Sequence, residues 1–356
     1  MQPLLEIENL SVAFETARGM VTAVNESSLT VFPGQTVALV GESGCGKSVT
    51  AMSILRLLPT PPAKYLGGQI RLEGKDLLSR SESEMRAVRG REIAMIFQEP
   101  MTSLNPVYSI GDQIVEAVTL HQHVSRREAW KIAETALGDV GINDPYRRLR
   151  EYPHQMSGGM RQRIMIAMAL SCKPKLLIAD EPTTALDVTI QAQILDLLRK
   201  LQNDTGMAML LITHDLGVVA EQADTVAVMY ASRIVEVAKV DAIFDSPQHP
   251  YTQGLLRSVP KLGADVARLE TIAGSVPSPA RFPSGCKFHP RCSAMQGDAR
   301  CSTVEPALRE VSPEHWGRCH HIPGFEQAPI TLPVLDSRRT VQIESTMELN
   351  DGEVLK

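Results

Sequence analysis

The stretch Gly41-Glu-Ser-Gly-Cys-Gly-Lys47-Ser48 decides the fold, because it matches the phosphate-loop pattern G-x-x-x-x-G-K-S/T. The apolar run Val37–Val40 precedes it and a helical pattern over 48–58 follows it, which is the strand–loop–helix context that the motif requires. In such a loop the glycines let backbone N–H groups turn towards a phosphate, the lysine reaches the β- and γ-phosphates, and the serine ligates Mg²⁺. The predicted nucleotide-binding residues are Gly41, Glu42, Ser43, Gly44, Cys45, Gly46, Lys47 and Ser48.

The composition limits the possible classes of function. The 356 residues are 43% hydrophobic but only 4% aromatic, which favours aliphatic packing between helices and a parallel sheet over an aromatic-rich β-sandwich. The net charge of −5 argues against a broad nucleic-acid-binding surface. No apolar run approaches the roughly 18 residues of a membrane-spanning helix. The N-terminus has no basic cluster, so we expect no signal peptide, and six cysteines then indicate a reducing cytosol.

Short apolar runs indicate the central strands of an α/β fold. The runs Val37–Val40, Leu176–Ala179 and Met209–Ile212 each end in polar or glycine residues, as do strands that are buried on both faces of a parallel sheet. Strand signals fade between about 100 and 171, where segments such as 126–140 have a helical pattern. We therefore expect a helical insertion within the α/β part.

The character of the sequence changes after about residue 246, where prolines accumulate and four of the six cysteines lie. We predict a first domain at 1–255, which contains the helical part at about 99–171. A small, loop-rich domain with a four-cysteine site follows at 256–328, and an extended tail at 329–356.

Several candidate catalytic residues follow the predicted strands. A carboxylate at the end of a buried strand beside a phosphate loop can hold Mg²⁺, and we assign that role to Asp180. Its neighbour Glu181 would polarise the attacking water, although two acids at a strand end are also common in a solvated turn. His214 ends the next apolar run and can donate a hydrogen bond to a γ-phosphate, and Gln98 can complete the Mg²⁺ shell.

The segment Met156-Ser-Gly-Gly-Met-Arg-Gln162 supplies a second anion site. Ser157 can cap the helix that follows, and Gly158 and Gly159 bare the N–H groups of its first turn. This segment resembles the signature motif of ABC-transporter ATPases, an element that kinases and GTPases with a phosphate loop lack. In that family it binds the γ-phosphate held by the other subunit, so that ATP is sandwiched at a dimer interface. Methionine stands at both positions where the family usually has leucine and glutamine.

The resemblance covers residues 1 to about 240. It implies a P-loop ABC ATPase cassette with a RecA-like core, an antiparallel β part and a helical insertion. It also implies ATP and Mg²⁺ as ligands, Glu181 and His214 as catalytic residues, and Ser48, Gln98 and Asp180 as the residues that serve Mg²⁺. Phe14 stands where the family stacks an aromatic ring on adenine, and Asp187 stands in a loop that contributes to the nucleotide site.

A narrower resemblance is to dipeptide and oligopeptide importers. The segments Glu99–Pro106, Ala185–Gln193 and His249–Thr252 are similar to the D-type ATPase subunit of those importers, and the similarity runs to about residue 320. It implies an F-type ATPase as the second subunit of a heterodimer, two transmembrane permease subunits, and an extracytoplasmic solute-binding protein. The chain would lie peripherally at the cytoplasmic face of the inner membrane.

Other functions fit parts of the sequence. The same type of subunit serves importers of nickel, glutathione and other small solutes, and the transported solute is chosen mainly by the permease and the binding protein. A soluble ABC ATPase outside transport belongs to a different class, but such proteins usually carry two cassettes or a coiled-coil insertion. A regulatory protein that only binds ATP is disfavoured by the complete hydrolytic set that Glu181 and His214 provide.

The four C-terminal cysteines are candidate metal ligands. Cys286, Cys292, Cys301 and Cys319 follow the spacing C-x5-C-x8-C-x17-C among turn residues. Four thiolates on irregular backbone can hold a [4Fe–4S] cluster or a structural Zn²⁺ ion, and free thiols are the third alternative. The close C-x2-4-C pairs of zinc ribbons are missing, and the resemblance to peptide importers also favours the cluster. We expect Cys45 and Cys172 to be structural.

Overall fold

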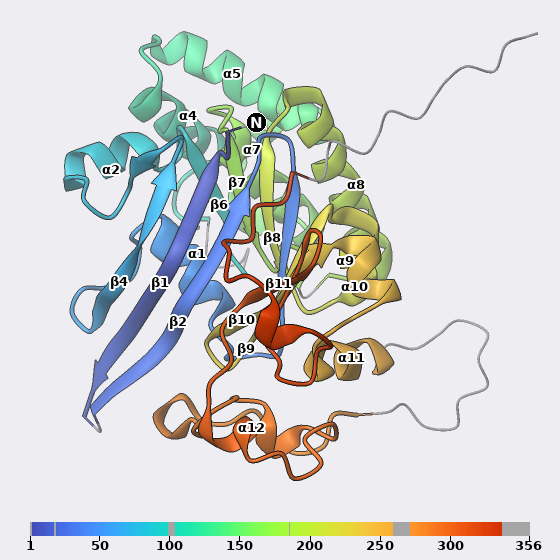
Figure 1. The fold of residues 1–356 in the computed structure, drawn as a ribbon. Helices are drawn as coiled ribbons and strands as arrows, with labels where there is room; N and C mark the ends of the chain where they lie inside the picture. Colours follow the sequence, from blue (N-terminus) through green and yellow to red (C-terminus); the bar gives the residue numbers. More distant parts are fainter. Residues whose placement is uncertain (1, 18, 99–103, 185, 259–270, 337–356) are drawn as a thin grey trace, which may run out of the picture.

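The computed structural model describes residues 2–17, 19–98, 104–184, 186–258 and 271–336. Two β-sheets form the framework of this part of the chain (Figure 1). The larger sheet has the strand order β11-β12-β10-β9-β3-β8-β7-β6, and the smaller has the order β2-β1-β4-β5. Among the described residues, no helix is long and apolar enough to cross a membrane.

The larger sheet is parallel at its centre and antiparallel at one edge. Its strands are β3 (Thr36–Val40), β6 (Ile93–Ile96), β7 (Leu176–Asp180), β8 (Ala208–Thr213), β9 (Thr225–Tyr230), β10 (Arg233–Lys239), β11 (Arg309–Ser312) and β12 (His315–Gly317). The pairs β3–β8, β3–β9, β7–β8 and β6–β7 are parallel, whereas β10 pairs antiparallel with both β9 and β12. The predicted parallel core is therefore confirmed, and the antiparallel edge extends it.

Helices cover both faces of the parallel strands, which explains why their sequences are apolar throughout. Every residue of β3, β7 and β8 is buried. Along β3, Val37 and Leu39 pack into one core cluster with α1, while Ala38 and Val40 pack into another with α9. The helices are α1 (Lys47–Ile54), α2 (Glu82–Val88), α4 (Ile110–His121), α5 (Arg126–Asp139), α6 (Pro145–Arg148), α7 (Gly158–Leu170), α8 (Val188–Thr205), α9 (Leu216–Gln222), α10 (Val240–Asp245), α11 (Pro250–Arg257) and α12 (Arg300–Thr303).

The register of the parallel strands aligns their carboxyl ends. Val40 of β3 lies opposite Thr213 of β8, and Asp180 of β7 lies opposite Ile212. Residues that follow these strands therefore emerge at the same edge of the sheet, where ligands of open α/β folds bind.

The smaller sheet is the antiparallel part that the resemblance to ABC-transporter ATPases implies. It contains β1 (Leu5–Thr16), β2 (Gly19–Val31), β4 (Ala63–Leu72) and β5 (Lys75–Asp76), with β1 paired to both β2 and β4. Buried residues of β1 such as Leu5 and Ile7 pack into the same core cluster as Val37 and Leu39 of β3. The two sheets therefore share one core.

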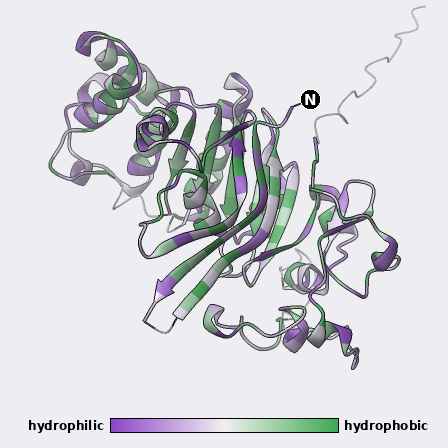
Figure 2. Cartoon of the chain, turned by 60° about the vertical axis from the view of Figure 1, so that its left-hand side comes forward, coloured by the Kyte–Doolittle hydropathy of each residue, from purple (hydrophilic) through white to green (hydrophobic). Residues whose placement is uncertain are grey.

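A helical part lies between β6 and β7, in the region predicted for the insertion, and occupies the upper part of Figure 1. Two of its helices, α4 and α5, begin at serine caps: Ser109 accepts a hydrogen bond from the Asp112 N–H, and Ser125 accepts one from the Glu128 N–H. Figure 2 shows green and purple on the same helices, as expected for helices with one apolar face.

The C-terminal region shares the sheet of the cassette and its core. The strand β12 pairs with β10, placing Trp316 opposite Val237, and Trp316 joins the same core cluster as Leu5. The sequence predicts a separate small domain over 256–328, whose exact limits stay a prediction. The strands β11 and β12 are only four and three residues long, so their period-2 pattern is too short to read among prolines and turns.

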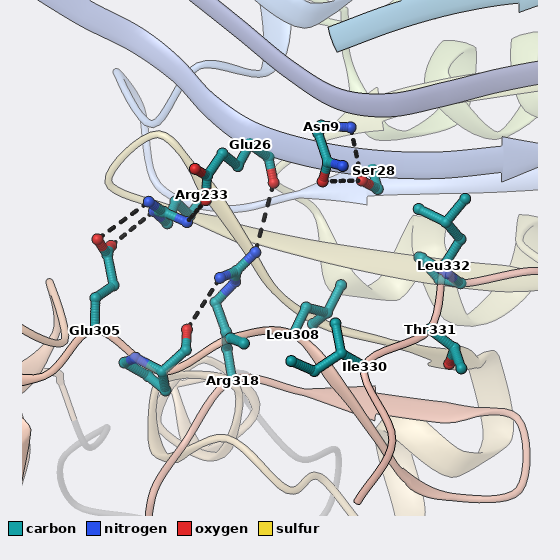
Figure 3. Close-up of a pocket in the computed structure, with 13 residues that line it drawn as sticks. Asn9, Glu26, Ser28, Arg233, Glu305, Leu308, Arg318, Ile330, Thr331 and Leu332 are labelled. Carbon is teal, nitrogen blue, oxygen red and sulfur yellow. Dashed lines mark hydrogen bonds and ion pairs between the residues drawn. The ribbon is translucent and has the colours of Figure 1, made fainter. Parts of the chain in front are cut away.

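Two buried arginines join this region to β2 and β10 beside a cavity of about 580 Å³ (Figure 3). Arg233 forms ion pairs with Glu26 of β2 and with Glu305. Arg318 donates to the carbonyl oxygens of Ile234, at 3.0 Å, and Pro306, at 3.0 Å. Burial, reinforced by repulsion from Arg233, lowers the pKa of Arg318 to about 10, so the guanidinium stays charged near neutral pH.

The beginning of the predicted tail packs against the cassette. Thr30 donates a hydrogen bond to the Pro333 carbonyl at 2.7 Å, and Gln35 donates one to the Leu335 carbonyl at 2.8 Å. The Leu335 side chain is buried in the main core cluster. Residues 329–336 belong to no helix or strand and are held by long-range contacts that local sequence cannot reveal, while the limits of the predicted tail stay a prediction.

The packing of this segment predicts a difference between two leucines. Leu335→Ala removes a core side chain that is 2% exposed and should lower the free energy of unfolding by about 2–3 kcal/mol. Leu332→Ala is the matched control, since Leu332 is 37% exposed, and should cost less than about 1 kcal/mol. Urea unfolding followed by fluorescence measures both. Equal costs would mean that the segment does not pack in the core.

Candidate nucleotide site

The phosphate loop, residues 41–48, joins β3 to α1 in a conformation that requires glycine at two positions. Gly41 has φ of 151° and Gly46 has φ of 114°. A Cβ on Gly41 would lie 2.1 Å from the Met229 carbonyl oxygen, and one on Gly46 would lie 2.3 Å from the Ala23 carbonyl oxygen. Because these neighbours are backbone atoms of adjacent elements, no side chain fits at either position without moving the loop.

Lys47 lies inside the loop. Its ammonium group donates to the Gly41 carbonyl at 2.7 Å and to the Glu42 carbonyl at 3.2 Å, and the residue is buried. The positive charge of Lys47 is therefore held by carbonyl groups of the loop itself, beside the place where the motif binds phosphate.

Asp180 ends β7 with one carboxylate oxygen that has no hydrogen-bond partner. The residue is buried, and Oδ1 is the unpaired atom. Burial raises the pKa of Asp180 and the neighbouring Glu181 charge adds to this, while a hydrogen bond with Ser48 acts in the opposite direction. A buried, unpaired carboxylate oxygen beside a serine hydroxyl fits a hard cation that takes oxygen ligands, as Mg²⁺ does.

Glu181 follows Asp180 in a left-handed conformation, with φ of 47°. Its Oε2 accepts hydrogen bonds from Gln98 Nε2 at 2.8 Å and from Thr184 Oγ1 at 2.9 Å, and its Oε1 lies 3.2 Å from His214 Nδ1. Burial by itself would raise the pKa of Glu181, but the hydrogen bonds from Thr184, His214 and Gln98 outweigh it and lower the pKa. The carboxylate is therefore kept ionised.

The structure thus gathers three predicted residues from three strand ends. Gln98, Glu181 and His214 follow β6, β7 and β8, which are neighbours in the sheet. The His214 side chain is 67% exposed, so a ligand at this edge can reach it. Thr184 was not among the predicted residues, although its place three residues after Glu181 in a turn makes the contact local.

The signature segment is built as a capped helix start. Ser157 precedes α7 and accepts a hydrogen bond from the Met160 N–H at 3.3 Å. Gly158 is exposed, and a Cβ there would meet nothing within 4 Å, so the first turn is open to solvent. The hydrogen bonds described for Ser157 are with Met160 and Arg161 of the same helix. None of them connects this segment to the phosphate loop of the chain.

Two further predicted residues have structural roles of their own. Asp187 caps α8 by accepting a hydrogen bond from the Ile190 N–H at 3.0 Å. Phe14 lies on β1 opposite Val21 and packs partly against the main core cluster. Neither contact excludes a nucleotide, and their predicted roles stay predictions.

Family models and curated relatives match this architecture. An ABC transporter model matches residues 24–184, and a model of the C-terminal region of oligopeptide/dipeptide transporters matches residues 235–301. A peptide import ATP-binding protein of Brucella abortus (strain 2308) is 55% identical over 330 residues, covering 89% of this chain and 97% of that protein. Another of that description, from Brucella suis biovar 1 (strain 1330), is 53% identical and covers 86% and 91%.

The chain belongs to the ABC transporter ATPases. Solved structures agree: a dimeric bacterial ABC transporter cassette has a TM-score of 0.59 and 25% identity, covering 66% of this chain and 98% of that one. cbiO1 from Clostridium perfringens, described as part of the ABC transporter complex cbiONQ, has a TM-score of 0.60 and 25% identity, covering 69% and 92%. The predicted ATP-binding, ATP-hydrolysing ABC cassette is therefore confirmed.

This ABC ATPase brings its four C-terminal cysteines to one small cavity, which histidines also line. The Cys286 N–H donates to the Cys301 carbonyl at 2.9 Å, and the Cys301 sulfur lies 3.3 Å from His321 Nε2. Burial raises the pKa of Cys286 to about 11 and that of Cys319 to about 12, and the neighbouring cysteines add to both shifts. Without a metal these thiols are therefore protonated near neutral pH.

The spacing of the sulfur atoms is wide. In the described part of the chain, the one group of three metal-ligating side chains whose atoms lie within 4.8 Å of one another is Asp298, Cys301 and His321, so no three of the four cysteine sulfurs meet this limit. In a tetrahedral zinc site with Zn–S bonds of about 2.3 Å, the sulfurs would lie about 3.8 Å apart.

The loop geometry predicts unequal effects of two glycine substitutions. Gly41→Ala places Cβ against the Met229 backbone and should weaken binding of a fluorescent ATP analogue by about 100-fold or more, since relieving the overlap means moving the loop. At Gly44 φ is 80° and nothing lies within 4 Å of a Cβ, so Gly44→Ala adds only the strain of a left-handed alanine. It should weaken binding of the analogue by about tenfold or less. Titrations on both variants measure this. Equal losses would contradict the geometric explanation.

Proposed function

We propose that this chain is the ATP-hydrolysing subunit of an ABC importer of dipeptides or oligopeptides. The observation that carries the hydrolytic part is the convergence of Gln98, Glu181 and His214 at the edge of the sheet that also holds the phosphate loop. Relatives that are more than half identical are described as peptide import ATP-binding proteins, and the C-terminal region matches the oligopeptide/dipeptide transporter model. An importer of nickel, glutathione or another small solute is the alternative within transport.

The chemistry would be divided among residues of this edge. Glu181, ionised because hydrogen bonds lower its pKa, would accept the proton of the attacking water, which His214 would help to orient. Lys47 and the loop amides would bind the β- and γ-phosphates. Ser48, Gln98 and Asp180 would bind Mg²⁺ directly or through water. Asp180 Oδ1, which has no hydrogen-bond partner in the structure, is the oxygen that is free to take this role. When bound, Mg²⁺ neutralises charge on the phosphate oxygens.

Assembly follows from the signature segment. Ser157, Gly158 and Gly159 would bind the γ-phosphate held by a second ATPase subunit, and Asp187 and Phe14 would complete the nucleotide site. The open first turn of α7 supports this, as does the dimeric form of the similar cassette. The second subunit would be an F-type ATPase, and the complex would contain two permease subunits and a solute-binding protein. The chain would act at the cytoplasmic face of the inner membrane.

The hydrolytic role is tested with Glu181→Gln in the assembled transporter. We expect ATP turnover to fall by about 100-fold or more while ATP affinity stays within about threefold, because the amide cannot take the proton. Glu221→Gln, an exposed residue of α9, is the matched control and should turn over ATP like the native protein. Near-normal turnover in Glu181→Gln would remove this residue from the role. Stimulation of the native transporter by nickel or glutathione instead of peptides would favour the alternative solute.

We further propose that Cys286, Cys292, Cys301 and Cys319 hold one [4Fe–4S] cluster. The four thiols line one cavity, and no three of their sulfurs lie within 4.8 Å of one another, whereas the sulfurs of a four-cysteine zinc site lie about 3.8 Å apart. The donor set therefore fits a larger, thiolate-bound centre. A cluster there would cross-link loop positions, which suits a segment with few secondary-structure elements.

Anaerobic purification tests the cluster. The native chain should be brown and contain about four irons and four acid-labile sulfides. Cys301→Ser should lose the iron, whereas Cys172→Ser, which changes a cysteine outside the site, should keep it. One zinc per chain would replace the cluster with a structural zinc ion, possible also at Asp298, Cys301 and His321. No metal would leave free thiols, with the proposed ATPase role untouched.

A further inference from the structure

Glu42 of the phosphate loop forms hydrogen bonds with side chains that lie more than two hundred residues further along the chain. Arg291 donates two hydrogen bonds to the Glu42 carboxylate, from Nη1 at 2.7 Å to Oε2 and from Nη2 at 3.1 Å to Oε1. The Glu42 N–H donates to the Tyr251 hydroxyl at 2.9 Å. Both the side chain and the backbone of the second loop residue are thus fixed by residues of the segment 235–301, which matches the transporter C-terminal model.

Arg291 is itself held rigidly. Its side chain is 5% exposed, and its Nε donates to the Ala273 carbonyl at 3.0 Å. The guanidinium carbon lies 5.8 Å from the centre of the Tyr230 ring, the last residue of β9. Burial alone would lower the pKa of Arg291, but the bonds with Glu42 and Tyr230 raise it, so the charge is permanent. A bidentate pair between such a rigid arginine and a carboxylate fixes direction as well as distance.

Tyr251 is equally well fixed. Its ring is fully buried and packs against Tyr230, with ring centres 4.6 Å apart, and against Phe288, with centres 5.5 Å apart. Its N–H donates to His249 Nδ1 at 3.0 Å. Burial lowers the pKa of His249 to about 4, so the ring is neutral and its Nδ1 can accept this bond.

Arg291 and Tyr251, which together form a clamp on Glu42, are connected to the segment that carries the cysteines. Arg291 ends a short 3-10 helix, His289–Arg291, that lies between Cys286 and Cys292. Phe288, which packs on Tyr251, stands two residues after Cys286. The backbone that positions the cysteines therefore also positions the groups that hold Glu42.

We propose that Arg291 and Tyr251 are positioning residues of the nucleotide site, which hold Glu42 so that the phosphate loop has its binding conformation and no unbalanced negative charge. The inference rests on the proposed function only in that ATP is the ligand of the loop. Glu42 lies beside Gly41 and Lys47, where an unpaired carboxylate would repel a polyphosphate. The C-terminal region thereby becomes part of the ATP site.

A double-mutant cycle on the full-length chain tests the clamp. Arg291→Ala should weaken binding of a fluorescent ATP analogue by about tenfold, because it leaves the Glu42 charge unpaired. Arg291→Lys should recover part of this, since lysine keeps the charge but not the fork. In Glu42→Gln/Arg291→Ala the unpaired charge is gone, so affinity should return to within about threefold of Glu42→Gln alone.

Arg300→Ala is the matched control. Arg300 also precedes a cysteine and pairs with an acid, Asp298, but its side chain is 54% exposed and its described ion pairs, with Asp298 and Glu326, stay within the C-terminal region. Its ATP affinity should equal that of the native chain. Iron or zinc content is measured in every variant, and it should be unchanged in Arg291→Ala if the arginine acts on the loop and not through the cysteine site.

Three results would overturn the proposal. The first is an ATP affinity of Arg291→Ala equal to that of the native chain, and the second is a loss of binding free energy in the double variant equal to the sum of the two single losses. The third is a loss of affinity that follows the thermal unfolding midpoint across all variants, since this would indicate general destabilisation. If the native chain itself bound no ATP analogue, the proposed ATPase function would fail first, so the two failures are distinguishable.

Discussion

The parallel register of β3, β8, β7 and β6 is the constraint on which the rest of the structure depends. Because Val40 lies opposite Thr213 and Asp180 lies opposite Ile212, the loops after these strands emerge at one level. A shift of a single residue would turn each strand over and move its buried side chains to the other face. The contacts of Glu181 with Gln98 and His214 depend on that register, because they join residues that follow three neighbouring strands.

A second level of organisation ties the C-terminal third to this framework. The strands β12 and β11 extend the same sheet beyond β10, and Arg233 and Arg318 are buried between the two parts. Polar groups taken out of water need partners, and here each arginine is satisfied by groups from the cassette and from the C-terminal region together. Removing either part would take away some of the partners of these arginines, which accounts for a shared core where composition indicates two domains.

The sequence was sufficient wherever chemistry and periodicity act over short distances. The phosphate loop, the apolar strands and the capped start of α7 could be predicted because each is defined by a few consecutive residues. The convergence of Gln98, Glu181 and His214 could be predicted because each ends an apolar run. The contacts of Glu42 with Tyr251 and Arg291 span 209 and 249 residues, and no local pattern marks them. The same holds for the packing of Leu335, which depends on core residues of both sheets and not on its neighbours in sequence.

The hydrogen bonds from Thr30 to Pro333 and from Gln35 to Leu335 have a consequence for biosynthesis. They join residues that are 303 and 300 positions apart, so the N-terminal strands leave the ribosome long before their partners exist. At about 5–20 residues per second this interval is roughly 15–60 s. During that time the apolar faces that will meet the C-terminal segment stay uncovered, and contacts of such long range also form slowly. Chaperones therefore have a long window in which to bind the nascent chain, and a chain that ends before residue 333 lacks the partners of Thr30 and Gln35.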